Sequence, residues 1–298
     1  MKEIKNAVKK IAEKIVSLFG FTIKRVVIKN DDLPLYIKLY GEESVKHRRF
    51  YNISAGSYLG FGGGMNHPCW TKIDVDRQWN KAQLCEKGVV YNPERDIFCD
   101  MLAMEPFPVE TSAAELVHTR FTIASITDAA AQYLFGEVHR ILKNGGIFRI
   151  STPNIDLDYR AYFNNDMTFF YWFENDKTVS IEQAFLFHVA SQLSSIHPDG
   201  VAERITDEQF RDLLKTKKME DALDFCTSKC SVEIQKKHRQ DHINWWNAKK
   251  LERMLRLAGF KSIYLSSREQ SASPVMRNEA YFDNEDNKFV MYMEAVKI

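Results

Sequence analysis

The chain has 298 residues, of which 45% are hydrophobic and 27% are charged. These proportions are ordinary for a globular protein, and the length suits one large domain or one domain with a substantial appendage. A formal net charge of +1 excludes the strongly basic balance typical of nucleic-acid-binding proteins, so we expect no nucleic-acid partner. The five cysteines are odd in number and scattered, which predicts free thiols in a reducing, cytoplasmic compartment.

The first 47 residues are predicted to form an amphipathic helix and a lead-in. Apolar residues recur there at helical spacing with lysines on the other face: Ile4, Val8, Ile11, Ile15 and Leu18. The lysines exclude a signal peptide, and no apolar run approaches the roughly 20 residues that span a bilayer. A basic helix of this kind can lie on an anionic membrane surface, or it can pack on its own domain or on a second copy of the chain. Peripheral membrane contact and a homodimer therefore both stay open.

Residues 48–155 alternate short apolar strands with helical stretches, which is typical of βαβ units and a parallel sheet. The helix between the last two predicted strands runs over Asp128–Leu142. Thr127 or Asp128 caps its start, and the Asn and Gly residues of 143–146 end it. The predicted strands are Phe50–Ser54, Thr71–Val75, Ile97–Cys99, Glu115–Thr119 and Gly146–Ser151.

The character changes at residue 156. Residues 156–242 are rich in aromatics and then helical, which predicts a cap inserted into the domain rather than another βα unit. Residues 243–298 return to the first domain: Asn247–Leu257 is an amphipathic helix ended by Gly259. Lys261–Ser266 and Phe289–Ala295 then read as an antiparallel hairpin at the edge of the sheet.

The stretch "NISAGSY" (residues 52–58) places a small-residue turn after the first strand. A doubly wound sheet binds nucleotides at this position, and an acidic residue about 20 positions later, here Asp74, holds ribose hydroxyls. The turn and Asp74 alone fit a plain structural loop equally well.

A sharper signal is "EVHRILKNGGIFRISTPN" (residues 137–154), which resembles class I S-adenosylmethionine-dependent methyltransferases. In one subgroup of that family, E-x-x-R-V-L-K-P-G-G precedes a strand that ends in P-N or P-D. Four further stretches stand in the family's order: "NISAG", "DIFCDM", "PFPVETSAAELVHTR" and "NAKKLERMLRLAGF". The resemblance covers roughly residues 48–155 and 245–296.

The resemblance implies an α/β, Rossmann-like, doubly wound and mostly parallel sheet with an antiparallel C-terminal edge hairpin and a helical, aromatic-rich cap. It implies S-adenosylmethionine as cofactor and S-adenosylhomocysteine as product. Gly56 would let the backbone approach the methionine end, Asp74 would accept the ribose hydroxyls, and Asp100 with Met101 would face the adenine. The complete predicted cofactor set is Ser54, Ala55, Gly56, Ser57, Tyr58, Asp74, Val75, Asp100, Met101 and Thr119.

Some positions depart from the family pattern. Ser54 and Ala55 stand where the family has Gly and Cys, and Ile123-Ala124-Ser125 replaces its L-E-H. These changes keep a second hypothesis open, a methyltransferase-fold binding or scaffold protein without catalysis. A nicotinamide-dependent oxidoreductase is disfavoured because the turn lacks GxGxxG. A nucleic-acid methyltransferase is disfavoured because no N/D-P-P-Y/F motif is present.

Methyl transfer to a hydroxyl needs alignment and a base, for which histidine or a carboxylate suits neutral pH. His242 and Asp241, in "HRQDHINWW", and Asp156 are the predicted catalytic residues, although the first two can equally orient the following helix. His188, His197 and His238 are further candidates. The pair Cys226 and Cys230 is not accompanied by a second close cysteine pair, so we expect no metal. The subgroup is frequent among bacterial enzymes that decorate glycans, so we expect O-methylation of a sugar, a surface-polysaccharide precursor or another small hydroxylated metabolite.

Overall fold

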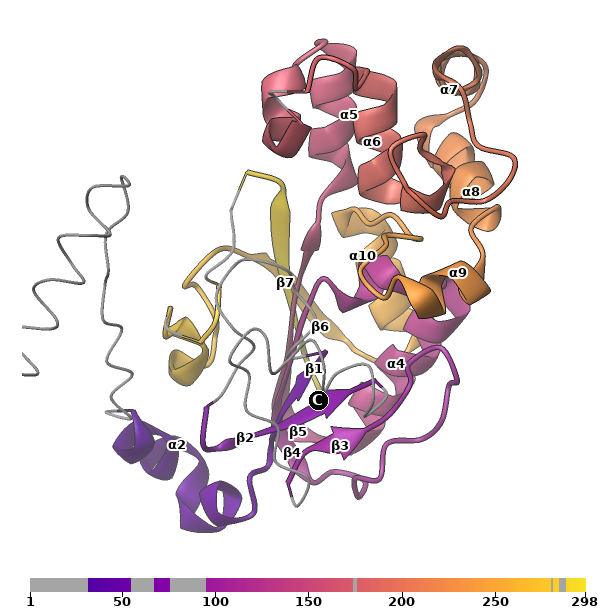
Figure 1. Cartoon of the computed structure of the whole chain (residues 1–298). Helices are drawn as coiled ribbons and strands as arrows, with labels where there is room; N and C mark the ends of the chain where they lie inside the picture. Colours follow the sequence, from indigo (N-terminus) through magenta and orange to yellow (C-terminus); the bar gives the residue numbers. More distant parts are fainter. Residues whose placement is uncertain (1–31, 55–66, 76–94, 174–175, 280, 284–287) are drawn as a thin grey trace, which may run out of the picture. The chain divides into compact units, whose positions relative to one another are not determined.

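The computed structural model describes residues 32–54, 67–75, 95–173, 176–279, 281–283 and 288–298 (Figure 1). The chain divides into two units, Met1–Leu33 and Pro34–Ile298, and the description below concerns the second. The predicted N-terminal helix lies outside the described residues.

Seven described strands form one sheet in the order β3-β2-β1-β4-β5-β7-β6. Strands β1 to β5 run parallel, whereas β7 is antiparallel to both β5 and β6. This arrangement confirms the predicted fold, a Rossmann-like doubly wound sheet with an antiparallel C-terminal edge. The bounds are β1 (Phe50–Ile53), β2 (Trp70–Asp74), β3 (Ile97–Phe98), β4 (Ala114–Arg120), β5 (Leu142–Pro153), β6 (Ser262–Ser266) and β7 (Val290–Val296).

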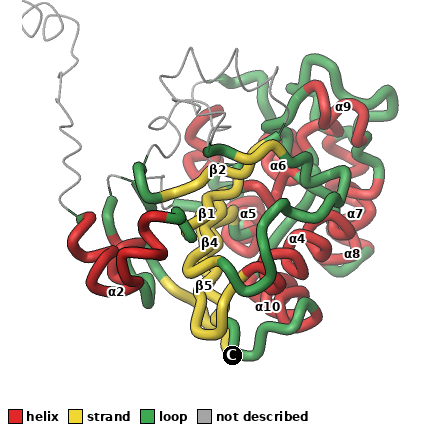
Figure 2. The backbone as a smooth tube through the Cα atoms, turned by 90° about the horizontal axis from the view of Figure 1, so that it is seen from below, coloured by secondary structure: helices red, strands yellow, loops and turns green. Residues whose placement is uncertain are grey.

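Helices cover both faces of the sheet (Figure 2). Helices α4 (Asp128–Ile141) and α10 (Ala248–Leu257) lie on one face, where their apolar sides meet the strands in the largest core. Helix α2 (Leu33–Lys46) lies on the other face, where Tyr36 packs edge-on against Phe50 and accepts a 2.7 Å hydrogen bond from the indole of Trp70. Burial on both sides explains why β1 and β2 read as continuous runs rather than as alternating strands.

The helix boundaries follow from capping. The Thr127 hydroxyl accepts a 3.2 Å hydrogen bond from the Ala130 amide, so of the two predicted candidates Thr127, and not Asp128, is the cap. The helix ends at Ile141, and β5 begins at Leu142 rather than at the predicted Gly146. The chain passes directly from the helix into the strand, which includes Gly145 at φ +79°. Asn247 caps α10, and Gly259 follows it at φ +104°, a conformation that disfavours any side chain.

Residues after β5 build a helical layer with its own hydrophobic core, which includes Phe170, Phe185, Phe210 and Leu223. Helices α5 to α8 group together beyond the end of β5 at the top of Figure 1. The elements are α5 (Ile155–Phe163), η2 (Met167–Phe173), α6 (Ile181–Val189), η3 (Ser191–Leu193), α7 (Asp207–Thr216), α8 (Met219–Ser228) and α9 (Val232–Lys237). The exact domain boundaries stay a prediction. No helix within the described ranges is long and apolar enough to cross a membrane.

A row of polar side chains crosses the face of the sheet that α2 contacts. Lys72, Asn52, His118, Arg149 and Glu294 are register partners on β2, β1, β4, β5 and β7, and all five are buried. Burial and the neighbouring arginines lower the pKa of His118 well below its usual range, so its ring is neutral.

The charges at one end of this row are paired. The Arg149 guanidinium is fully buried and donates to the carboxylates of Asp283 (3.2 Å to Oδ1) and Glu294 (2.9 Å), and to the Ser267 carbonyl (2.8 Å). Buried charges in proteins require this kind of complete pairing.

Replacing Arg149 by Met should therefore lower the free energy of unfolding by about 3–5 kcal/mol, because two buried carboxylates lose their counter-charge. Urea denaturation of the purified variants measures the loss. The matched control is Arg256→Ala, which breaks an exposed ion pair with Glu252 and should cost about 0.5 kcal/mol. Equal costs for the two substitutions would contradict the assigned role of Arg149.

Candidate functional site

The carboxyl ends of the parallel strands meet at one edge of the sheet. From β1 the chain proceeds outward through β2 and β3, then returns to place β4 on the other side of β1. The strand order reverses between β1 and β4, and ligands of doubly wound sheets bind outside the carboxyl ends of the strands at such a switch point. This edge is therefore the candidate functional site.

The predicted cofactor turn is described only at its first residue. Ser54 follows β1 in the left-handed region (φ +57°), where the family pattern has glycine, and its N–H donates to the Ile73 carbonyl at 2.7 Å. The turn thus begins with the conformation that glycine favours, although a serine occupies it. Ala55, Gly56, Ser57 and Tyr58 lie outside the described residues.

Asp74 and Asp100 lie at the ends of β2 and β3, as predicted. Asp74 is buried and accepts a 2.8 Å hydrogen bond from the Val75 amide. Asp100 is partly exposed and receives two 3.2 Å hydrogen bonds from the guanidinium of Arg239. Met101, next to it, is buried.

Thr119 lies buried at the switch point, between the ends of β1 and β4. It is fully buried, and its hydroxyl donates to Thr122 at 2.7 Å and lies 3.4 Å from the Ile53 carbonyl. Its contacts therefore join the end of β4 to the end of β1, and a contact with a cofactor stays a prediction.

The segment Arg239–Trp246 crosses the same edge. The amides of Ile243 and Asn244 both donate to the Ala124 carbonyl (2.9 and 3.1 Å), and the Trp246 carbonyl accepts from the Ile155 amide at 2.8 Å. The Trp246 indole donates to the Ile123 carbonyl at 2.8 Å. The residues that replace the family's L-E-H thus anchor this segment through their backbone.

The three predicted catalytic residues are in different environments. Asp156 is exposed in the first turn of α5, where its carboxylate accepts from the side chain of Asn247 (3.2 Å). Asp241 is buried and accepts from the His197 ring at 3.0 Å. Burial raises the pKa of Asp241, and the neighbouring His197 opposes that increase.

His242 lies against the cap. Its ring Nδ1–H donates to the His188 carbonyl at 2.7 Å, and its amide donates to the Ser191 hydroxyl at 3.0 Å. Burial and the neighbouring His188 lower the pKa of His242 to about 4. The ring is consequently neutral near pH 7 and can exchange hydrogen bonds but carries no charge.

A buried pair that motif reading missed lies beside His242. The Asp158 carboxylate in α5 is hydrogen-bonded to Nδ1 of His188 in α6, and both residues are buried. The other carboxylate oxygen of Asp158 has no hydrogen-bond partner. Within the described part of the chain, no hydrogen bond involves Nε2 of His188. His188 was one of several candidate histidines, but nothing in the sequence pattern connects it to Asp158.

Aromatic rings surround this pair. The ring centroids of Trp172, Phe289 and His242 lie 4.9, 5.0 and 5.3 Å from that of His188. Phe121, the first residue after β4, packs against Phe289 with the ring centroids 5.9 Å apart, and it holds a left-handed backbone (φ +59°). A bulky residue in this conformation is strained, and such strain is concentrated at functional sites.

No protein-family model matches the chain, and a search of curated proteins gives no match. Solved structures that resemble it include a Thermotoga maritima SAM-dependent methyltransferase, described as a possible histamine N-methyltransferase (TM-score 0.40, 11% identity, 84% of this chain and 82% of that one). Phosphoethanolamine N-methyltransferase 2 of Haemonchus contortus, with S-adenosylmethionine bound, gives 0.37 and 13%, covering 83% of this chain and 48% of that one. The methyltransferase SibL gives 0.37 and 11%, covering 88% and 53%.

The chain spans about half the length of two of these three proteins. At these TM-scores and identities, the likeness supports no conclusion about the activity of this chain. The fold assignment rests instead on the strand order of the sheet. That order has the parallel strands, the reversal at β1 and the antiparallel β7 expected of a class I methyltransferase fold.

The neutral His242 predicts a stability loss in acid. Between pH 6.5 and about 4, His242 is protonated in the unfolded chain but not in the folded one. As the pH falls through this range, this group therefore lowers the free energy of unfolding by about 1.4 kcal/mol for each pH unit. Urea denaturation at pH 7, 6, 5 and 4.5 measures the slope. His242→Asn should reduce it and the exposed His47→Asn should not. Identical slopes in wild type and His242→Asn would contradict the assignment.

Proposed function

We propose that the protein is an S-adenosylmethionine-dependent methyltransferase that methylates a hydroxyl of a sugar, a surface-polysaccharide precursor or another small hydroxylated metabolite. The observation that carries this proposal is the Asp158–His188 pair: a buried carboxylate oriented onto a histidine whose second ring nitrogen has no hydrogen bond among the described residues. Such a pair beside the carboxyl edge of a methyltransferase-type sheet suits a general base.

The chemistry follows from the orientation of the ring. With Nδ1–H directed at Asp158, Nε2 carries the lone pair and can accept the proton of an acceptor hydroxyl. S-adenosylmethionine, held by the residues at the strand ends, would supply the methyl group to the oxygen that His188 deprotonates, with S-adenosylhomocysteine as the other product. Asp158 then stabilises the imidazolium that has taken the proton.

The proposed cofactor site uses the residues at the ends of β1, β2 and β3. Asp74 is an acidic residue at the end of β2, where a carboxylate can accept two ribose hydroxyls. The backbone of Ser54 begins the turn toward the methionine end, and Asp100 lies where the adenine is expected. The cofactor supplies an electrophilic methyl group on a cationic sulfonium. Solved neighbours with S-adenosylmethionine or S-adenosylhomocysteine bound include the Haemonchus enzyme and PigF.

The acceptor is inferred from the aromatic surroundings of His188. Trp172 and Tyr171 are partly exposed, and flat aromatic faces of this kind stack well on sugar rings. The solved neighbours include N- and carbon methyltransferases, so they do not indicate the acceptor. A hydroxyl is favoured because a nucleophile with an O–H proton is the acceptor that most needs a base.

The alternative, a binding or scaffold protein without catalysis, has one observation in its favour. Ile123 and Ala124, which replace part of the family's L-E-H, are buried and use their carbonyls to anchor the segment Arg239–Trp246. Membrane contact and homodimer formation through residues 1–47 stay predictions.

Titration calorimetry separates the two functions. Wild type should bind S-adenosylmethionine and S-adenosylhomocysteine with micromolar dissociation constants, and Asp74→Ala should weaken both at least tenfold, about 1.4 kcal/mol. Asp212→Ala, at an exposed acidic residue of α7, is the matched control and should leave affinity unchanged. A folded wild type that binds neither ligand would overturn the enzyme proposal and favour the scaffold.

The base is tested by His188→Asn. Transfer of a labelled methyl group from S-adenosylmethionine to a panel of sugar nucleotides should fall about 10²–10⁴-fold, while the dissociation constant of the cofactor stays within twofold. Asp158→Asn should also lower kcat, because the ring loses its orienting charge. His47→Asn is the matched histidine control. Full activity in His188→Asn would rule out this residue as the base even if cofactor binding is confirmed.

A further inference from the structure

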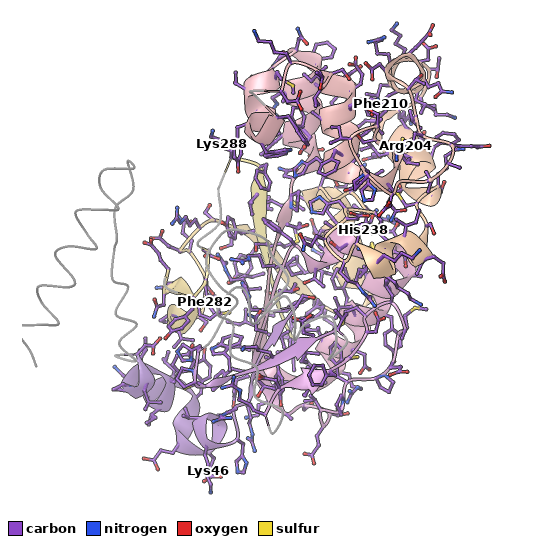
Figure 3. All side chains as sticks on the ribbon, viewed as in Figure 1. Lys46, Arg204, Phe210, His238, Phe282 and Lys288 are labelled. Atoms are coloured by element: carbon purple, nitrogen blue, oxygen red, sulfur yellow. The ribbon has the colours of Figure 1, made fainter. Side chains whose placement is uncertain are left out.

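A second cluster of metal-ligating side chains lies outside the proposed active pair. One ligand atom from each of His197, His238 and Asp241 lies within 4.8 Å of the others. His197 belongs to the loop after η3, whereas His238 and Asp241 follow α9, and Figure 3 labels His238 beside the segment that leads to α10. Among the described residues, these three side chains form a group close enough together to hold a metal ion.

One buried carboxylate oxygen in this cluster accepts no hydrogen bond. Nε2 of His197 lies 3.0 Å from both carboxylate oxygens of Asp241, but its hydrogen bond is directed at Oδ1. Oδ2 is buried and has no hydrogen bond, and Asp241 as a whole is only 8% exposed. The Gln192 side chain, which bonds to the Ser231 backbone (2.7 and 3.1 Å), also lies beside Asp241. An unsatisfied buried carboxylate oxygen is costly and calls for an explanation such as an ion.

The two halves of the cluster are held in place independently. On one side, Gln235 donates to the carbonyls of Ser125 (2.6 Å) and Asp241 (3.0 Å). On the other side, the Val201 amide donates to the Gln192 carbonyl, and a Cβ at Gly200 would come within 2.3 Å of that carbonyl oxygen. Because these bonds order the backbone of both halves apart from the Asp199 amide, a ligand that bridges them has little ordering cost.

We propose that His197, His238 and Asp241 bind a divalent transition-metal ion, and that zinc is the ion the ligand set fits. Two imidazoles and one carboxylate form a mixed nitrogen and oxygen set that suits zinc and is too nitrogen-rich for magnesium or calcium. Zinc bonds of about 2.0–2.1 Å need ligand atoms roughly 3.3 Å apart, so the cluster closes by a modest movement of side chains.

Binding of the ion requires a change in the hydrogen bonds of the His197 ring. Its Nδ1 now accepts from the Asp199 amide at 3.1 Å, so the proton is on Nε2. When the ion takes Nε2, the proton moves to Nδ1 and the Asp199 amide turns away. Asp199 is exposed, and its carboxylate, 2.9 Å from Nε2 of His238, is within reach of a fourth coordination position.

The site has a structural role. The ion joins the loop that contains His197 to the segment that continues into His242 and that carries Arg239, the partner of Asp100. It would thereby fix the carboxyl edge from the side of the cap. Neither the ion nor its ligands take part in the proton transfer proposed above, so this inference stands independently of the proposed function.

Calorimetric titration of the chelator-treated, tag-free full chain with ZnCl₂ tests the site. Wild type should bind one ion per chain, and zinc should raise its Tm. His238→Ala should weaken binding at least thirtyfold and abolish the Tm shift. Its ring is partly exposed, with the exposed Asp199 as its ion-pair partner, so the variant should fold, which circular dichroism checks. His238→Gln replaces it if it does not.

Two controls locate the ion. His47→Ala, at an exposed histidine, should bind zinc as wild type does. Cys230→Ser tests the competing thiol, because burial and, to a smaller extent, the charge of Asp241 raise the pKa of Cys230. This variant should also bind zinc normally. The Co²⁺ form should show the visible bands of a nitrogen and oxygen site without a thiolate charge-transfer band. Absence of zinc binding in wild type, unchanged binding in the folded His238 variants, or loss of binding in Cys230→Ser would each overturn the proposal.

Discussion

The rest of the site depends on how the segment Arg239–Trp246 is hydrogen-bonded across the carboxyl edge of the sheet. Two of its amides share the Ala124 carbonyl after β4, and its last carbonyl accepts from Ile155 after β5. Because these bonds are backbone to backbone, they fix the segment whatever its side chains do. Its side chains are then free to make three separate contacts: Arg239 with Asp100, Asp241 with His197, and His242 with the cap. One stretch of chain thus joins the proposed cofactor edge, the proposed ion site and the proposed active pair.

The sheet beneath this edge has an unusual interior. One face is apolar and packs on α4 and α10, while the other carries the buried row from Lys72 to Glu294. Such a row adds little net stability, because each charge loses its hydration, but it penalises any strand register that would leave Arg149 unpaired. The strained residues Ser54 and Phe121 stand at the ends of β1 and β4, at the switch point itself. A rigidly specified sheet can support that strain at the position where ligands are expected.

Local patterns in the sequence were sufficient to predict most of the fold. Apolar runs gave the positions of the seven strands, and Thr127 and Asn247 marked two helix starts because capping is a property of neighbouring residues. The start of β5 was misplaced because glycines that usually end an element lie inside this strand. Long-range pairs could not be read in the same way: Asp158 lies 30 residues from His188, and His197 lies 44 from Asp241. Helix packing in the cap, which no local pattern encodes, brings each pair together, so the proposed base and the proposed ion site both emerge only from the structure.

The proposed reaction requires that the proposed cofactor edge and the Asp158–His188 pair face one another. A crystal structure of the full chain with S-adenosylhomocysteine bound shows whether they do. The ribose should contact Asp74, and the sulfur should be directed at Nε2 of His188, with room for one acceptor hydroxyl between them. A ligand bound elsewhere, or a sulfur separated from His188 by protein, would contradict the proposed reaction.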